Sequence, residues 1–260
     1  TELDHHPVTG LGEYSFSGTY SPDHQTNHNL ISFCNQIQSV TIPESVTSIG
    51  KSAFEHCSKL DSLTIKGVAT SIGAYAFASC TSLTSLSLVG SFQTIGDSAF
   101  VNCGMTSLTI DATITSIEKY AFSSRFLTSL SLTGNVQKIG DHAFDSCSSL
   151  NTVTFPKSPT SIGSYAFDSC TSLNSIEIPG TVEYKEKLYT VTSIGELAFA
   201  HCSKLTRVTI PSSVTSIGDY AFVGCSALMS VDFAKNSQLK SIGDCAFAHC
   251  SLLTSIEIPE

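Results

Sequence analysis

The ten cysteines of this 260-residue chain are the side chains with most potential for chemistry, as disulfides, metal ligands or nucleophiles. Eight of them stand three residues after a phenylalanine: Cys57, Cys80, Cys103, Cys147, Cys170, Cys202, Cys225 and Cys250. Cys34 takes the same place in a degenerate first unit, while Arg125 interrupts the series and Cys245 stands outside it. Side chains stacked in parallel about 4.8 Å apart are poorly oriented for disulfides. The spacing therefore predicts a ladder of reduced, buried cysteines.

Metal and catalytic sites have little support in the sequence. Zinc sites use close cysteine pairs or histidine partners at short spacing, and neither pattern recurs. His5, His6, His24 and His28 crowd the N-terminal region, where a solvated loop is the more common explanation than a metal centre. The many serines lack the local context of a nucleophile. We therefore predict no enzyme activity, no metal and no cofactor.

Composition excludes two further classes of partner. The net charge is −9, only 13% of the residues are charged, and no cluster of lysine and arginine is present. Binding to nucleic acid or to an anionic membrane surface would need such a cluster. No stretch approaches the roughly 18 apolar residues of a membrane helix. Neither nucleic acid nor membrane insertion is expected.

The cysteines belong to a unit of about 23 residues that repeats along the chain. Its clearest marker is an Ala-Phe pair whose phenylalanine recurs at Phe54, Phe77, Phe100, Phe122, Phe144, Phe167, Phe199, Phe222 and Phe247. A fixed period of this size is typical of a solenoid, in which each unit buries its apolar face only against its neighbours. The sequence predicts a single domain over residues 1–260 with about ten repeats. The first repeat, 8–42, is degenerate and carries an insertion at 17–33, and a second insertion occupies 181–191.

Each unit divides into three parts. The first, as in Leu205-x-x-Val208-x-Ile210, ends in an alternating, β-branched segment that predicts a short strand. Stacked strands from successive coils would form a parallel sheet on one face. The second part is expected to be a turn, often begun by proline, that leads to Val-Thr-Ser-Ile-Gly, with an inward isoleucine and a close backbone approach at the glycine. The third, Ala-Phe-x-x-Cys, is expected to form a single helical or 3₁₀ turn on the opposite side.

The full pattern, Ile-Gly-x-x-Ala-Phe-x-x-Cys-x-x-Leu-x-x-[Val/Leu/Ile]-x-Ile-Pro, resembles the BspA-like leucine-rich repeats over roughly residues 8–260. Those repeats occur in surface and secreted proteins of host-associated bacteria and of protists such as trichomonads. The resemblance implies a right-handed leucine-rich-repeat solenoid and an extracellular or cell-surface location. It also implies a role in adhesion or protein binding, with no catalytic residues to carry over.

Two columns of outward residues on the predicted strands are the candidate binding face. They are almost entirely serine and threonine. These residues suit any exposed β surface, so a purely structural role is the alternative to binding. Four charged residues near the C-terminal end depart from this pattern and are the predicted ligand contacts: Glu177, Arg207, Asp232 and Glu257. The expected partner is a protein or glycan on another cell or in the matrix.

A different class of function is also open, a structural subunit that forms filaments. Residues 253–258 read as a finished strand without a polar cap, and residues 8–12 have the sequence phase that follows such a strand in each internal repeat. Head-to-tail contact would continue the solenoid into the next chain and would not close. The predicted contact residues are Leu11, Phe16, Leu253, Ile256 and Ile258. The alternative is that residues 1–7 and 17–33 cap the N-terminal coil.

Overall fold

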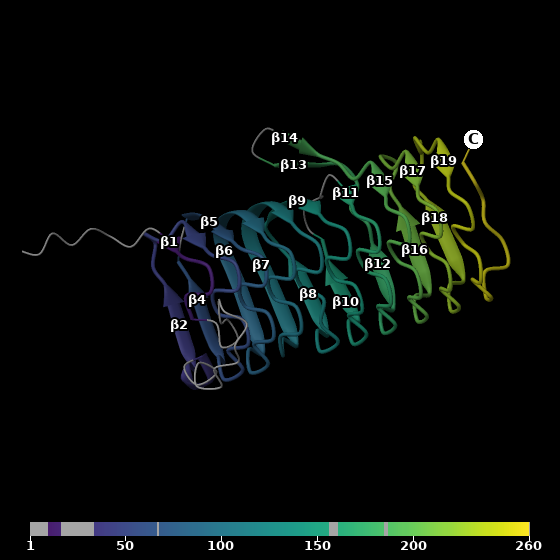
Figure 1. The fold of residues 1–260 in the computed structure, drawn as a ribbon. Coiled ribbons are helices and arrows are strands. Elements are labelled where there is room, and N and C mark those ends of the chain that lie inside the picture. Colours follow the sequence, from purple (N-terminus) through teal and green to yellow (C-terminus); the bar gives the residue numbers. More distant parts are fainter. Residues whose placement is uncertain (1–9, 17–33, 67, 156–160, 185–186, 260) are drawn as a thin grey trace, which may run out of the picture.

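The structure, a computed structural model, describes residues 10–16, 34–66, 68–155, 161–184 and 187–259. Successive coils stack along one axis, so that the chain advances from β1 to β19 with two rows of parallel strands side by side (Figure 1). The predicted solenoid is confirmed. We call the two rows the broad sheet and the narrow sheet.

The broad sheet is formed by the predicted Leu-x-x-Leu-x-Ile segments, one per coil. Its strands are β2 (Ser39–Ile42), β4 (Ser62–Ile65), the first halves of β6 (Ser85–Ile95) and β7 (Ser107–Ile117), β8 (Ser129–Leu132), β10 (Thr152–Thr154), β12 (Ser175–Glu177), β16 (Arg207–Ile210) and β18 (Ser230–Phe233). Neighbouring strands pair one repeat apart, as in Ser107 with Ser129. Among the described residues the hydrogen-bonded ladder is interrupted twice, between β4 and β6 and between β10 and β12.

The narrow sheet arises from the Val-Thr-Ser-Ile-Gly segments, where no strand was predicted, while the predicted turn precedes them, as at 44–45 and 212–213. Its order is β1-β3-β5-β6-β7-β9-β11-β15-β17-β19. The added strands are β1 (Gly10–Leu11), β3 (Ser48–Ile49), β5 (Val68–Ile72), β9 (Asn135–Ile139), β11 (Ser161–Ile162), β15 (Ser193–Ile194), β17 (Ser216–Ile217) and β19 (Ser241–Ile242). The isoleucine does point inward, as Ile95 and Ile117 are fully buried and paired.

The Ala-Phe segments form turns and not the helical turns that were predicted. The single described 3₁₀ helix is η2 (Cys34–Gln36). Backbone N–H groups in these turns donate to the next coil, as Tyr75 does to Asp97 at 2.9 Å and Phe77 to Ala99 at 2.8 Å. The residue two positions before the phenylalanine has a positive φ, for example 58° at Tyr75 and 54° at His142. Bonds within the coil are also present, as from Ala78 N–H to the Tyr75 carbonyl at 3.0 Å, so each turn is held both within its coil and between coils.

The core is a continuous stack of phenylalanine rings. Consecutive rings of the Ala-Phe pairs are nearly parallel, with centroids 5.1 Å apart between Phe77 and Phe100 and 5.3 Å apart between Phe199 and Phe222. The central rings are fully buried. The alanine before each phenylalanine is also buried, which lets adjacent coils approach closely.

The cysteine ladder is confirmed except at its N-terminal end. From Cys80 onwards each ladder thiol is free and donates to the carbonyl oxygen of the preceding coil's phenylalanine, as Cys225 does to Phe199 at 3.2 Å. Cys34 and Cys57 instead form a disulfide, so the prediction that all ladder cysteines are reduced was wrong there. Their Cα atoms lie 4.7 Å apart, inside the range that disulfides span even though parallel stacking is unfavourable for them. Cys245 is exposed.

We expect stability to fall steeply with pH above the usual thiol range because of these buried groups. Burial, with the adjacent Cys250, raises the pKa of Cys225 from 9.0 to about 12. A raised pKa in the fold means that the stabilisation is complete below the unfolded pKa and is lost as the pH rises towards 12. Each pH unit in that window removes about 1.4 kcal/mol per thiol. Urea unfolding at several pH values gives the free energy of unfolding as a function of pH. That free energy should fall less steeply with pH in Cys225→Ala than in the parent chain, whereas Cys245→Ala should match the parent. The same pH dependence of stability in the parent chain and both variants would contradict a contribution from the buried Cys225 thiol.

Two departures from the repeat were predicted, and the structure describes one of them in part. Within 181–191 the chain forms an antiparallel hairpin of β13 (Val182–Tyr184) and β14 (Lys187–Tyr189), which projects from the solenoid in Figure 1. Thr190 donates to Thr181 at its base. The insertion at 17–33, residues 1–7 with His5 and His6, and His24 and His28 lie outside the described residues.

The predicted strand over residues 253–258 is absent. These residues are described, but they form no ladder with β18. The segment borders only one other coil, so it lacks the second neighbour that holds each internal strand in place.

Candidate functional site

The outer face of the broad sheet is uncovered along the described residues, and small hydroxyl side chains dominate it. Outward residues alternate with buried ones along each strand, so that Ser107 and Thr109 are exposed while Leu108 and Ile110 are buried. Because the strands are parallel and in register, each hydroxyl lies beside its counterpart in the next coil, as Thr109 does beside Ser87 and Ser131. The two predicted hydroxyl columns are therefore present.

The four predicted contact residues do not form one cluster. Arg207 donates from Nε to the Asp232 carboxylate at 2.6 Å, and both side chains are exposed. Glu177 lies one strand away from Arg207, where it pairs with Thr209 in the ladder. Glu257 is exposed in the C-terminal segment outside the strands. The structure thus pairs Arg207 with Asp232, so that their charges offset each other, and Glu177 has no ion-pair partner among the described residues.

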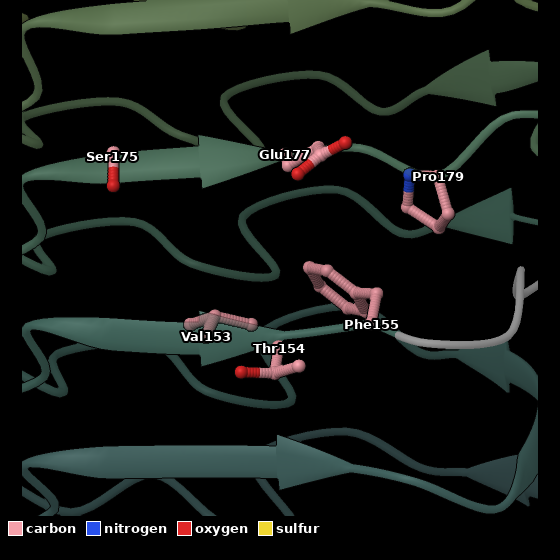
Figure 2. A pocket seen from close by; sticks show the side chains of 6 residues that line it. All are labelled: Val153, Thr154, Phe155, Ser175, Glu177 and Pro179. Carbon is pink, nitrogen blue, oxygen red and sulfur yellow. The ribbon is translucent and has the colours of Figure 1, made fainter.

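A recess opens beside Glu177, where the ladder between β10 and β12 is interrupted. It has a volume of about 330 Å³ and is lined by Val153, Thr154, Phe155, Ser175, Glu177 and Pro179. Figure 2 shows Phe155, Glu177 and Pro179 grouped at the carboxyl ends of the two strands, with Ser175 at the start of β12. The sequence pattern gave no signal for this recess, although it did single out Glu177.

The other interruption, between β4 and β6, produces a similar recess. Its volume is about 380 Å³, and its lining includes Asp61, Ser62, Thr64, Ser85 and the exposed Val89. Here too one carboxylate stands beside hydroxyl groups over an apolar floor. Both recesses therefore lie at places where neighbouring strands of the broad sheet are not hydrogen-bonded to each other. We call these places open steps.

Comparison with known proteins places this architecture in a family. A family model described as the BspA type leucine rich repeat region matches residues 27–126, 115–190 and 186–260. The chain belongs to the BspA-type leucine-rich repeat family. This membership confirms the resemblance on which the predicted fold rested. No match was found among curated proteins.

Several solved structures are similar to this BspA-type chain. A leucine-rich cell surface protein from Faecalibacterium prausnitzii is 22% identical, with a TM-score of 0.38, over 93% of this chain and 88% of the other. A leucine-rich repeat protein from Bacteroides ovatus is 24% identical, with a TM-score of 0.39, over 96% and 82%. The pneumococcal vaccine antigen PcpA is 20% identical, with a TM-score of 0.47, over 96% and 73%.

The turn side of this BspA-type solenoid carries histidine–carboxylate pairs. His142 lies between the rings of Tyr120 and Tyr165, and its Nδ1 is 2.8 Å from Asp145. His201 Nδ1 is 2.9 Å from Asp168. The first pair lies within one coil, and the second joins two neighbouring coils. In the described ranges no group of three or more potential ligands could hold a metal ion, and no helix has the length and apolar character to span a bilayer.

The residues predicted for head-to-tail contact lie at opposite ends of the BspA-type solenoid (Figure 1). Leu11 and Phe16 line an apolar recess of about 480 Å³ on the N-terminal coils, next to Val40 and Phe54. At the other end, Leu253 and Ile256 are half-buried and Ile258 is exposed. Nothing in the structure brings the two sets together.

Proposed function

We propose that the chain is a non-enzymatic, extracellular or cell-surface binding module. Its outer broad-sheet face would hold a protein or glycan on another cell or in the matrix. The observation that carries this proposal is the uncovered outer face of the broad sheet, with aligned hydroxyl columns across many coils. Membership of the BspA-type family and the cell-surface description of one similar structure support the location.

The physical character of the face suits recognition. Its side chains are short, so few rotamers are lost when a partner covers them. The strands beneath are fixed by hydrogen bonds and by the ring stack, so the backbone does not need to be ordered on binding. Serine and threonine both donate and accept hydrogen bonds, which fits peptide and sugar groups alike.

An arginine placed at the centre of this face should reduce binding at least about tenfold, because it would hold a partner away from the sheet. Strand β7 offers a matched pair of sites: Thr109 is exposed on the broad sheet and Thr115 on the narrow sheet. We expect Thr109→Arg to lower binding to a panel of immobilised matrix proteins and glycans, and Thr115→Arg to leave it unchanged.

Circular dichroism and thermal unfolding should confirm that both variants fold like the parent chain. Unaltered binding by Thr109→Arg, or equal loss in both variants, would remove the broad sheet from the proposed function. Reproducible turnover of a substrate that depends on one residue would contradict the non-enzymatic part.

A second candidate function is head-to-tail self-association. One observation favours it: the turn ladder has a direction, because the backbone N–H groups of Tyr75 and Phe77 point towards the next coil. The phenylalanine stack likewise adds one ring per coil, and its first ring, Phe16, is exposed. A second copy could extend both features without a new type of contact. The missing strand at 253–258 counts against it, and electron microscopy at high protein concentration separates filaments from dispersed monomers.

A further inference from the structure

The recess between β10 and β12 differs from the rest of the broad sheet because its floor is accessible. Inward residues of strands bonded on both sides are closed off, with Leu130 at 2% and Val208 at 0% exposure. Val153 holds the equivalent position in β10 and is only half-buried. The open step therefore creates a site with an apolar floor in a face that is mostly flat and polar.

In the described lining of this recess the one charged side chain is a carboxylate. Glu177 is exposed at the mouth, and in the described part of the chain its carboxylate has no ion-pair partner. The nearest cation in the ladder, Arg207, is engaged by Asp232. A carboxylate among hydroxyl groups favours a cation, since it attracts positive charge and accepts charge-assisted hydrogen bonds.

The strand edges around the recess add hydrogen-bond acceptors. Strand β10 pairs only with β8, and β12 only with β16, among the described strands. Backbone carbonyl groups on the facing edges thus have no ladder partners. Such unpaired groups of an edge strand are available to another chain. A guanidinium group has five N–H donors and no acceptor, so it matches a site made of a carboxylate, carbonyls and hydroxyls.

We propose that this recess binds an arginine side chain of a protein partner, with Glu177 accepting hydrogen bonds from the guanidinium. The inference rests on the proposed function and narrows its partner to a protein with an exposed basic side chain. The volume of about 330 Å³ lies at the lower end of ligand pockets, which suits one side chain better than an oligosaccharide.

The recess between β4 and β6 supports the same chemistry. Asp61 stands there with hydroxyls on both walls, and it too has no ion-pair partner among the described residues. Four strand steps of about 4.8 Å separate the two recesses, so they lie about 19 Å apart. A partner with two arginines at this separation would engage both.

The test is an NMR titration of the full chain with a blocked five-residue peptide that carries one central arginine among glycines and serines. The control peptide carries citrulline, which has the same shape without the charge. At low ionic strength the arginine peptide should shift the amide signals of residues 153–155 and 175–179, and should bind at least about fivefold more tightly than the citrulline peptide. Glu177→Gln should weaken binding of the arginine peptide about fivefold, whereas Glu44→Gln, in the exposed turn after β2 and outside the recess, should not.

Equal binding of both peptides, unchanged affinity in Glu177→Gln, or shifts confined to other surfaces would overturn the proposal. Tighter binding of a neutral oligosaccharide at the same amides would overturn it as well and assign the recess to glycans. These failures are distinct from failure of the proposed function. If Thr109→Arg abolishes binding to the matrix panel while Glu177→Gln leaves both assays unchanged, the broad-sheet function stands and the arginine site falls.

Discussion

Replacement of Phe144 by alanine is expected to destabilise the fold by about 4 kcal/mol, one of the largest effects available to a single substitution here. The ring is fully buried and lies between those of Phe122 and Phe167, with centroids 5.6 and 5.2 Å away. Its removal forfeits the transfer free energy and leaves a cavity that the stacked coils cannot close, because inter-coil hydrogen bonds such as Phe144 to Ala166 fix their spacing. Urea unfolding followed by circular dichroism would measure the loss.

Phe126 provides the matched control because it is the same residue type on the surface, 42% exposed and covered only in part by Arg125. Phe126→Ala should cost less than about 1 kcal/mol. Repeat arrays can depart from two-state unfolding, so transition midpoints should be compared along with fitted free energies. Similar losses in both variants would show that the ring stack contributes no more than ordinary surface contact.

The ring stack is also the part of the fold that could best be predicted from sequence. A period of about 23 residues places every Ala-Phe pair at the same point of successive coils, so the burial of one phenylalanine implies a column of them. The cysteines three residues later follow by the same reasoning. The disulfide between Cys34 and Cys57 could not be separated from the free rungs, since the same sequence separation of 23 also joins free pairs such as Cys80 and Cys103.

The narrow sheet and the turn conformation were missed for physical reasons. Several of its strands have two residues, too short for an alternating pattern to be visible. The positive φ before each Ala-Phe pair occurs at residues as different as Tyr165 (57°), Leu197 (51°) and Cys245 (52°). Bonds between coils impose this conformation, and the local side chain carries no signal of it.

The candidate site was predictable only in outline. Departure from the hydroxyl consensus did identify Glu177, and it also identified Arg207 and Asp232, which neutralise each other. The open steps of the sheet could not be foreseen, because Ser62–Ile65 beside an open step and Ser107–Ile110 in a bonded one have the same pattern of residues. Whether two strands bond depends on the exact stacking of their coils.

The glycine after each isoleucine leads to the second large prediction. A Cβ atom on Gly195 would lie 2.5 Å from the carbonyl carbon and 2.6 Å from the carbonyl oxygen of Gly163 in the adjacent coil. These contacts confirm that the position requires close backbone approach. They involve fixed backbone atoms, so the coils themselves would have to separate. That movement would strain the bonds from Gly195 to Ile162 and from Phe167 to Ala198.

We therefore expect Gly195→Ala to destabilise the chain by about 3 kcal/mol, although alanine usually favours folding through the unfolded state. Gly180→Ala is the matched control, since its Cβ would meet only Pro211 at an ordinary 3.6 Å. This variant should stay within about 1 kcal/mol of the parent. The same urea unfolding measurement applies to both. Parent-like stability of Gly195→Ala would mean that the spacing between coils can expand locally. That result would contradict the rigid backbone on which the proposed binding face depends.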